Sequence, residues 1–249
     1  MAIDKLTDKK HWEDAYVDID FTKEKKTSEI YKWIAHHLPK VTSNKSSFEV
    51  GIFPARFSVI FGDLGYEVNG IDRIESVGTT MKHWLEKENY KVGDLICDDF
   101  FTYDYKKKYD VVSSFGFIEH FKNFEEVIKV QANLVAENGY IIIEVPNFKG
   151  RIQNFLKKRL DKKNLDVHYV PSMDFGKWEK VLRENQFEII AKDYLGSFSL
   201  QTYPQKRNSF QKAFINFIQR RRFFIKKYLL KGVSKHHSPM MIMMAKKVL

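Results

Sequence analysis

The sequence predicts an α/β fold organised around a single sheet. Short apolar runs alternate with longer stretches whose apolar residues recur at helical spacing, a pattern typical of strand–helix units rather than of all-α or all-β proteins. Five such alternations are followed by two more strands with a long insertion between them. The chain has 249 residues, of which 43% are hydrophobic, so it can bury a substantial core. No segment suggests a second, independent core.

Seven short apolar runs are predicted as strands. The run YIIIEVPN follows the turn-forming pair Asn138-Gly139 and is the most hydrophobic, so we expect it near the centre of the sheet. In chain order the predicted strands are 47–51, 66–72, 95–99, 109–115, 140–147, 187–195 and 239–248.

Helices are predicted between the strands, from apolar residues that repeat every three or four positions. Ser28 is a suitable N-cap for a first helix, with Ile30, Ile34 and Leu38 along one face. Pro54 is suited to the first position of the next helix. The later helices are expected at 55–64, 81–86, 123–134 and 176–184.

Composition excludes several classes of protein. Cys97 is the only cysteine, which excludes an internal disulfide framework and a multi-cysteine zinc site and fits a reducing environment. No run reaches the ~18 apolar residues of a membrane span. The polar N-terminus MAIDKLTDKKHWED is unlike a secretory signal. We therefore expect a cytoplasmic protein.

The net charge of +10 is unevenly distributed along the chain. The last acidic residue is Asp193, and the segment from there to Leu249 carries twelve Lys and Arg, so the preceding part has a net charge of −2. A protein that clamps nucleic acid would not usually confine its positive charge in this way. The distribution therefore argues against a nucleic-acid partner.

Ligands of an open parallel sheet bind beyond the carboxyl ends of the strands, near the point where strand order reverses. Gly51 follows the first strand and permits a tight turn into a helix, whose free N–H groups can face a ligand. Asp72 ends the second strand, at the spacing at which an acid meets a ribose diol in dinucleotide folds. Asp99 with Phe100 offers an acceptor and an aromatic face for a purine. The alternatives to these ligand-binding roles are that Gly51 is an ordinary turn glycine, that Asp72 caps a helix, and that Phe100 packs in the core.

Five segments carry these residues in order: FEVGIFPARF, GID, CDDFF, YDVVSSFGFIEHF and NGYIIIEVPN, over about positions 47–147. In them the sequence resembles the class I S-adenosylmethionine-dependent methyltransferases, and more narrowly single-domain bacterial enzymes associated with surface-polysaccharide biosynthesis. The resemblance implies a Rossmann-like, seven-stranded, mostly parallel sheet with helices on both faces and an antiparallel last strand. It also implies S-adenosylmethionine as cofactor and S-adenosylhomocysteine as product.

The same resemblance assigns residues to the cofactor. Gly51 would lie under its methionine part, Asp72 would bind the ribose hydroxyls, and Asp99 with Phe100 would hold adenine. Asp98 is the alternative to Asp99, because a shift of one position exchanges them. The remaining cofactor-binding candidates are Glu49 and Phe115.

The turn after the first strand departs from the family pattern. The family usually has two or three glycines there, whereas only Gly51 remains, and Phe53 and Ala55 occupy later positions of the turn. The departure favours an alternative in which the chain is a non-catalytic binding or scaffold protein with a degenerate cofactor turn.

Three residues are candidates for catalysis on the acceptor. Methyl transfer is an in-line displacement, in which the protein aligns the acceptor and can remove its proton. His120 follows the fourth strand and is the first candidate base, with Glu119 placed to orient its imidazole or bind the acceptor. His168 is the second candidate base. The alternatives are that His120 packs in the core, that Glu119 caps the following helix, and that His168 is exposed at the surface.

A metal site is not expected from the sequence. Some relatives that methylate catechol-like hydroxyls hold a divalent metal with an equivalent Glu-His and an acid three residues earlier. Gly116 occupies that earlier position here. We therefore predict metal-independent transfer.

The whole chain, 1–249, is predicted as one methyltransferase domain. In the first of its parts, Trp12 and Tyr16 are placed either to close over the cofactor or to staple the segment to the body. The parts are an N-terminal helical cap (1–45), a cofactor-binding core (47–147), an acceptor-side segment (148–186) and a basic helical insertion before the last strand (201–237).

The basic insertion has two interpretations. Segment 209–231 is predicted as a helix that either caps the acceptor side with a solvated basic face, or contacts an anionic acceptor or anionic lipid at the inner face of the membrane. Its apolar stripe is expected to consist of Phe210, Phe214, Phe217, Ile218, Ile225 and Tyr228.

The preferred function is methyl transfer to a small-molecule acceptor, at a hydroxyl of a sugar or glycan intermediate that can carry phosphate. Asn147, at the end of the fifth strand, is placed to hydrogen-bond the acceptor. Besides the scaffold protein, an RNA methyltransferase is an alternative, although no Asn-Pro-Pro-aromatic segment or catalytic cysteine pair is present. The oligomeric state is not predicted.

Overall fold

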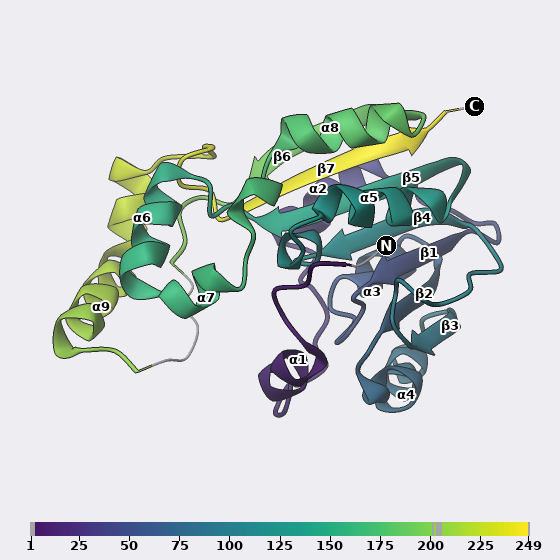
Figure 1. Cartoon of the computed structure of the whole chain (residues 1–249), viewed down its shortest axis with the longest axis horizontal. Helices are drawn as coiled ribbons and strands as arrows, with labels where there is room; N and C mark the ends of the chain where they lie inside the picture. The colour runs from purple at the N-terminus through teal and green to yellow at the C-terminus, as the bar shows by residue number, and fades with distance from the viewer. Residues whose placement is uncertain (1–2, 201, 203–205, 249) are drawn as a thin grey trace.

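A seven-stranded mixed sheet forms the centre of the structure, a computed structural model that describes residues 3–200, 202 and 206–248 (Figure 1). The strand order is β3-β2-β1-β4-β5-β7-β6. The first five strands pair in parallel, and β7 runs antiparallel to both of its neighbours. The strands are β1 (Ser46–Val50), β2 (Glu67–Asp72), β3 (Val92–Cys97), β4 (Tyr109–Phe115), β5 (Val135–Pro146), β6 (Phe187–Leu195) and β7 (Met240–Lys247). The predicted fold class is confirmed.

The central strands are apolar on both faces because helices cover both faces. Val111 and Ile142 pack with helices α2 and α3 on one face, whereas their neighbours Val112 and Ile141 pack with α5 and α8 on the other. This alternation follows from the two-residue period of side chains along a strand. The helices are α2 (Glu29–His37), α3 (Ser58–Asp63), α5 (Phe124–Asn133) and α8 (Phe175–Glu184), with α4 (Thr80–Lys87) beside α3.

Most of the predicted elements are found close to their expected bounds. Ser28 caps α2 as predicted, since its hydroxyl accepts a hydrogen bond from the backbone N–H of Tyr31 at 3.2 Å. The helix predicted at 55–64 is wrong at its start: α3 begins at Ser58. Ala55 has a φ of 64°, a left-handed conformation that an α-helix cannot contain, and the Phe53-Pro54 peptide is cis.

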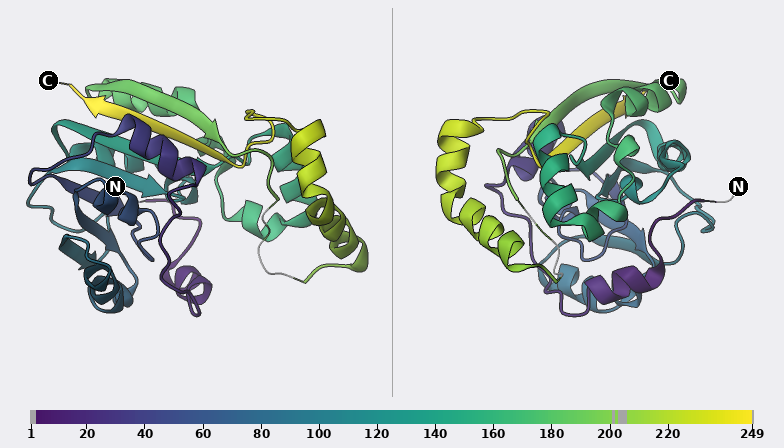
Figure 2. Two further views of the ribbon diagram at one scale, coloured as in Figure 1. Left: turned by 180° about the vertical axis from the view of Figure 1, so that it is seen from behind. Right: turned by 60° about the vertical axis from the view of Figure 1, so that its left-hand side comes forward.

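Helices α6 (Arg151–Leu160), α7 (Lys162–Asp166) and α9 (Ser209–Phe224) stand beyond the carboxyl ends of the parallel strands (Figures 1 and 2). A π-helical turn, Ile225–Leu229, extends α9. Helices α6 and α9 share a small apolar cluster with Phe198, made of Leu156, Leu160, Phe198, Ile215 and Ile218. Within the described residues, none of the helices has both the length and the apolar character needed to cross a bilayer.

The apolar stripe predicted for α9 is partly wrong. Ile218 is buried, and Phe214 and Ile225 are partly buried, but Phe210, Phe217 and Tyr228 are exposed. The helix turns Ile215 and Ile218 toward α6, so most of its aromatic side chains are left on the outer face. Residues 1–2 of the predicted cap and residues 201 and 203–205 of the predicted insertion lie outside the described residues.

A buried ion pair joins α6 to α7. Lys157 Nζ lies 2.8 Å from Asp161 Oδ2, and the two side chains are 4% and 0% exposed. Asn164 donates a second hydrogen bond to the same oxygen, and Arg207 lies 3.6 Å from Oδ1. One turn later Lys162 and Asp166 form the same kind of pair at the surface, at 2.7 Å.

These two pairs make a matched test of burial. Asp161→Asn removes the buried carboxylate that Lys157, Asn164 and Arg207 contact, and should lower the free energy of unfolding by about 3 kcal/mol. Asp166→Asn removes an exposed pair and should lower it by less than about 0.5 kcal/mol. Urea unfolding of the two variants and the parent chain measures both values. Equal losses would contradict a stabilising role for the buried pair.

Candidate active site

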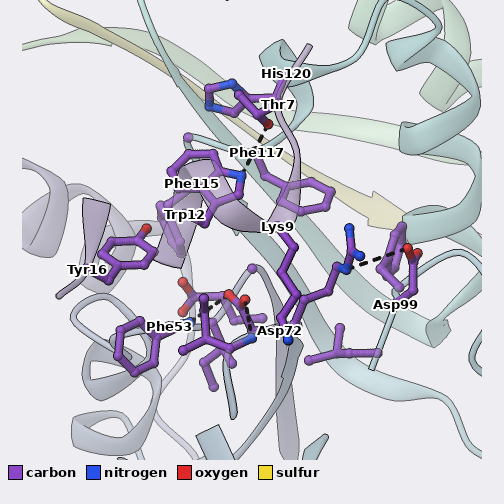
Figure 3. Close-up of a pocket in the computed structure, with 18 of the residues that line it drawn as sticks. Thr7, Lys9, Trp12, Tyr16, Phe53, Asp72, Asp99, Phe115, Phe117 and His120 are labelled. Atoms are coloured by element: carbon purple, nitrogen blue, oxygen red, sulfur yellow. Dashed lines mark hydrogen bonds and ion pairs between the residues drawn. The ribbon is translucent and has the colours of Figure 1, made fainter. Parts of the chain in front are cut away.

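A pocket opens at the carboxyl ends of β1, β2, β3 and β4, where the strand order reverses between β1 and β4 (Figure 3). Its volume is about 300 Å³. Residues of the N-terminal segment cover it from the outside. All of the predicted cofactor-binding residues line this one pocket, together with His120: Glu49, Gly51, Asp72, Asp98, Asp99, Phe100 and Phe115.

The turn after β1 leaves room for a glycine only. Gly51 has a φ of +75°, and a Cβ at this position would lie 2.8 Å from Cδ2 of Phe117. Its N–H donates to the carbonyl of Ile71 at 2.9 Å, which ties the turn to β2. The turn after β1 and the loop after β4 are therefore in direct contact across the floor of the pocket.

Phe53 belongs to the wall of the pocket. Its ring is 6% exposed and packs edge-on against Tyr16 and Phe21, with centroid distances of 5.1 and 5.7 Å. Figure 3 shows Phe53 and Tyr16 together at one side of the pocket, with Asp99 at the opposite side. Phe53, which replaces a family glycine, thus packs against the N-terminal segment and does not fill the pocket.

Asp72 is held by the backbone at the end of β2. Its Oδ2 accepts a hydrogen bond from Phe53 N at 3.1 Å, and its Oδ1 accepts one from Ile74 N at 3.2 Å. Burial raises the pKa of Asp72 to about 6, against the effect of these hydrogen bonds. Each carboxylate oxygen has a second lone pair, so the ionised side chain can accept two further hydrogen bonds from a diol.

Glu49 lies at the buried end of the pocket. The hydroxyl of Ser58, the first residue of α3, donates a short hydrogen bond to Glu49 Oε2. Burial raises the pKa of Glu49 to about 8, although this hydrogen bond opposes the rise. Glu49 is therefore largely neutral at pH 7, and Asp72 is the charged group of the pair.

Asp99 and Asp98 have different environments. Asp99 Oδ2 lies 2.8 Å from Lys5 Nζ and 3.9 Å from Arg73 Nε, and Oδ1 accepts a hydrogen bond from Phe101 N at 3.0 Å. Asp98 is exposed and accepts a hydrogen bond from the N–H of Asp99 at 2.6 Å. Asp99 is therefore the better fixed of the two acids beside the buried Phe100 ring.

The pKa of Asp99 reflects this difference. Partial burial would raise the pKa, but the hydrogen bonds from Lys5 and Phe101 and the charge of Arg73 lower it overall. The sequence did not indicate Lys5 as a site residue, because Lys5 and Asp99 are far apart in the chain and no local pattern connects them.

The N-terminal segment crosses the pocket with helix α1 (Lys9–Ala15). Trp12 stacks on Tyr16 at 5.8 Å, meets the His120 ring edge-on at 4.9 Å, and donates from Nε1 to Thr7 Oγ1 at 3.2 Å. The backbone N–H of Leu6 donates to the carbonyl of His120 at 2.8 Å. In this structure the segment therefore covers the pocket and is also fastened to the body.

The three predicted catalytic residues form one buried cluster. Oε1 of Glu119 lies 3.9 Å from Nε2 of His120 and 4.0 Å from Nε2 of His168. Glu119 and His120 belong to a short 3-10 turn after β4, and His168 follows α7. Of the three, only His120 lines the pocket.

Hydrogen bonds fix the tautomer of both histidines. Nδ1 of His120 lies 2.8 Å from the carbonyl of Val167, and Nδ1 of His168 lies 2.6 Å from the carbonyl of Asn164. A carbonyl oxygen only accepts, so each Nδ1 carries the proton and each Nε2 presents its lone pair.

The pKa values of the cluster follow from its burial. Burial lowers the pKa of His120 to about 3 and that of His168 to about 4, and it raises the pKa of Glu119 well above its usual value. An efficient general base has a pKa near the working pH. Both histidines are therefore neutral at pH 7, and as general bases they are weak.

Asn147 does not face an acceptor. Its Nδ2 donates to the carbonyls of Lys235 and Ser238, at 3.1 and 3.0 Å, and its Oδ1 accepts a hydrogen bond from Gly150 N at 3.1 Å. Asn147 instead holds together the loops that follow β5 and precede β7, so the predicted contact with the acceptor is wrong.

Comparison with known proteins agrees with this geometry. A family model described as a methyltransferase domain matches residues 24–192. Comparison with curated protein sequences gives no match.

Solved structures share the fold over nearly the whole chain. A magnesium protoporphyrin IX methyltransferase from Synechocystis PCC 6803, with bound SAH, has a TM-score of 0.55 and 16% identity, covering 96% of this chain and 93% of that chain. A putative methyltransferase from Bacillus halodurans C-125 has a TM-score of 0.59 and 14% identity, covering 89% of this chain and 99% of that chain.

A third similar structure is a SAM-dependent methyltransferase from Archaeoglobus fulgidus, with a TM-score of 0.55 and 17% identity, covering 88% of this chain and 93% of that chain. At these identities the likeness shows the fold alone. The family model, in contrast, matches more than half of the chain and includes the whole of β1 to β5. The chain therefore belongs to the methyltransferase domain family.

Proposed function

We propose that the chain is an S-adenosylmethionine-dependent methyltransferase that methylates a hydroxyl of a small-molecule acceptor. One observation carries the proposal. The left-handed Gly51 turn, the half-buried Asp72 and the Asp99–Phe100 pair come from three successive strand ends and line a single pocket of about 300 Å³. That volume lies at the lower end of the range for small-molecule sites.

The residues divide the cofactor between them. Asp72 accepts hydrogen bonds from the ribose hydroxyls, Phe100 packs against adenine, and Asp99 accepts from the exocyclic amine. Gly51 allows the methionine part to approach the backbone. When bound, the cofactor supplies an electrophilic methyl group, and the chain's own task is to align the acceptor oxygen with it.

His120 is the residue best placed to meet the acceptor from the pocket side. It lines the pocket, and its Nε2 presents a lone pair because Nδ1 donates to Val167. Nε2 can therefore accept a hydrogen bond from an acceptor hydroxyl and orient it, which needs no protonated form of the ring. Glu119 and His168 lie directly behind it.

The dependence of cofactor affinity on pH tests the role of Asp72. Burial favours the protonated carboxyl, with a pKa of about 6, whereas the ribose hydroxyls favour the ionised form. Below pH 6 binding must release a proton, so affinity for S-adenosylhomocysteine should rise up to about tenfold per pH unit toward pH 6 and then level off. Calorimetric titration from pH 5 to 8 measures it.

Two variants complete this test. Asp72→Asn should bind more weakly than the parent chain at pH 7 and lose the rise below pH 6. Asp94→Asn removes a carboxylate of β3 that does not line the pocket, and it should bind like the parent chain at every pH. A folded parent chain that binds neither S-adenosylmethionine nor S-adenosylhomocysteine would refute the function and favour the non-catalytic binding protein.

For the acceptor we propose a sugar or glycan intermediate that carries phosphate or is linked to a lipid. The basic helices support an anionic acceptor or carrier, because α6, α7 and α9 stand at the same end of the sheet as the pocket (Figure 1). An RNA acceptor is the competing interpretation of the same charge. Its affinity would fall steeply with salt.

We further propose that α9 and the turn after it contact an anionic membrane surface. We call the exposed residues of this region the basic–aromatic face: Phe217, Arg220, Arg221, Arg222, Phe223, Phe224, Lys226, Lys227 and Tyr228. The chain has no Asp or Glu after Asp193, so no carboxylate of this segment neutralises these cations. Cations with exposed aromatic rings are the composition that binds anionic lipid headgroups at an interface.

Vesicle binding tests the basic–aromatic face. The chain should co-sediment with vesicles of phosphatidylcholine and phosphatidylglycerol, and not with phosphatidylcholine alone. Replacing Arg220, Arg221 and Arg222 by Gln should weaken binding more than tenfold, because each cation near the surface contributes about 1 kcal/mol. The matched control replaces Lys106, Lys107 and Lys108 by Gln and should bind like the parent. Equal losses, or binding of RNA in place of vesicles, would refute the membrane contact.

A further inference from the structure

A buried carboxyl group that has no hydrogen-bond partner in another described residue lies close to two imidazole nitrogens. Glu119 is 1% exposed, and neither of its carboxylate oxygens has a hydrogen-bond partner in another described residue. A buried polar group left unsatisfied costs roughly 1–3 kcal/mol, and more if it is charged. The fold therefore buries the Glu119 carboxyl group at a cost in free energy that no hydrogen bond from another described residue offsets.

The two histidines complete the arrangement. Their Nδ1–H groups donate to backbone carbonyls, of Val167 and Asn164, and their Nε2 atoms face Glu119. Imidazoles that ligate metals are oriented in this way, by a hydrogen bond from the nitrogen that does not ligate. The three ligand atoms lie within 4.8 Å of one another.

We propose that Glu119, His120 and His168 bind one divalent transition-metal ion. Two imidazoles and one carboxylate suit Zn²⁺, Mn²⁺, Fe²⁺ or Co²⁺, and they suit Mg²⁺ and Ca²⁺ poorly, because those ions prefer oxygen ligands. Tetrahedral ligands at ~2.1 Å from zinc lie roughly 3.4 Å apart. The two separations from Glu119 therefore need to close by about half an ångström, and the two histidine nitrogens, which lie within 4.8 Å of each other, by at most about 1.4 Å. Closing them requires rotation of the Glu119 side chain and a shift of both imidazole rings toward each other.

The side of the cluster that faces the pocket is uncrowded. A Cβ added to Gly116 would have only Glu119 Oε1 within 4 Å, at 3.5 Å, and Gly116 itself lines the pocket. Three protein ligands leave a coordination position open for a substrate oxygen. We assign that position to the acceptor hydroxyl, which the metal would then hold in place of the hydrogen bond to His120 Nε2 proposed for the metal-free site. This role rests on the methyltransferase function proposed above, whereas the metal site itself does not.

The proposed site replaces the expectation of metal independence. The sequence predicted no metal because the third ligand was expected three residues before Glu119, where Gly116 has no side chain to supply one. The third ligand, His168, comes instead from the segment after α7, which the backbone N–H of Tyr169 fixes against the carbonyl of Glu119 at 2.6 Å.

Metal titration of tag-free protein, stripped with EDTA and dialysed, tests the site. We expect one equivalent of Co²⁺ to bind with a visible absorption spectrum of nitrogen-ligated cobalt, and one equivalent of Zn²⁺ to displace it. Proton NMR of the cobalt-loaded parent chain should show two shifted imidazole N–H signals, from the Nδ1 protons of His120 and His168. A parent chain that binds no cobalt, or that binds it without those two signals, would overturn the site.

The variants are chosen to keep the local hydrogen bonds. Glu119→Gln preserves the shape of the side chain, and His168→Asn retains a donor for the Asn164 carbonyl while removing the atom that faces Glu119. Each should weaken Co²⁺ binding at least tenfold. The control His83→Asn changes an exposed histidine of α4 and should bind like the parent. Unchanged affinity in the first two variants would overturn the site.

Titration of the same samples with S-adenosylhomocysteine separates this inference from the proposed function. Cobalt binding without cofactor binding would retain the metal site and refute the methyltransferase function. Cofactor binding without cobalt binding would refute the metal site and leave the methyltransferase function in place. Each result therefore decides one of the two claims.

Discussion

The reversal of strand order between β1 and β4 determines where every candidate functional group lies. The chain winds outward from β1 to β3 in one direction and from β4 to β5 in the other, so the connections diverge and leave a crevice at the carboxyl ends. Gly51, Asp72 and Asp99 face this crevice because each lies at or just after the carboxyl end of a strand of the first half. Because the crevice is partly closed from water, it also explains why the carboxyls of Glu49 and Asp72 titrate so far above their usual range.

Much of this arrangement could be predicted, because strands and their ends leave local signals in the sequence. The seven strands, the antiparallel last strand and the residues of the pocket wall follow from apolar runs, from acids at strand ends and from a family resemblance. The start of α3 was missed because Ala55 adopts a left-handed conformation that its residue type does not announce. The exposed face of α9 was predicted wrongly. Its apolar residues recur at helical spacing, but which of them are buried depends on packing against α6, and no local pattern in the sequence reveals that contact.

Contacts between distant segments were beyond the reach of the sequence. Lys5 meets Asp99, and His168 meets Glu119, only after the chain has folded. The short segment from Gly116 to His120 lies near both of these contacts. Phe117 packs on Gly51, His120 lines the pocket, and Glu119 lies behind His120. One loop therefore faces the cofactor side and the histidine cluster at once, which couples the geometry of the two.

The position of β7 has a consequence for how the molecule is made. Among the described residues, β6 is an edge strand that pairs only with β7, and β7 is the last strand. During synthesis β6 therefore has no partner in the sheet until residues 240–247 have left the ribosome. Until that moment the segment between the two strands, whose residues Ile215 and Ile218 pack against α6, is joined to the sheet at its first end alone. The sheet is completed by a strand inserted between its neighbours, β5 and β6.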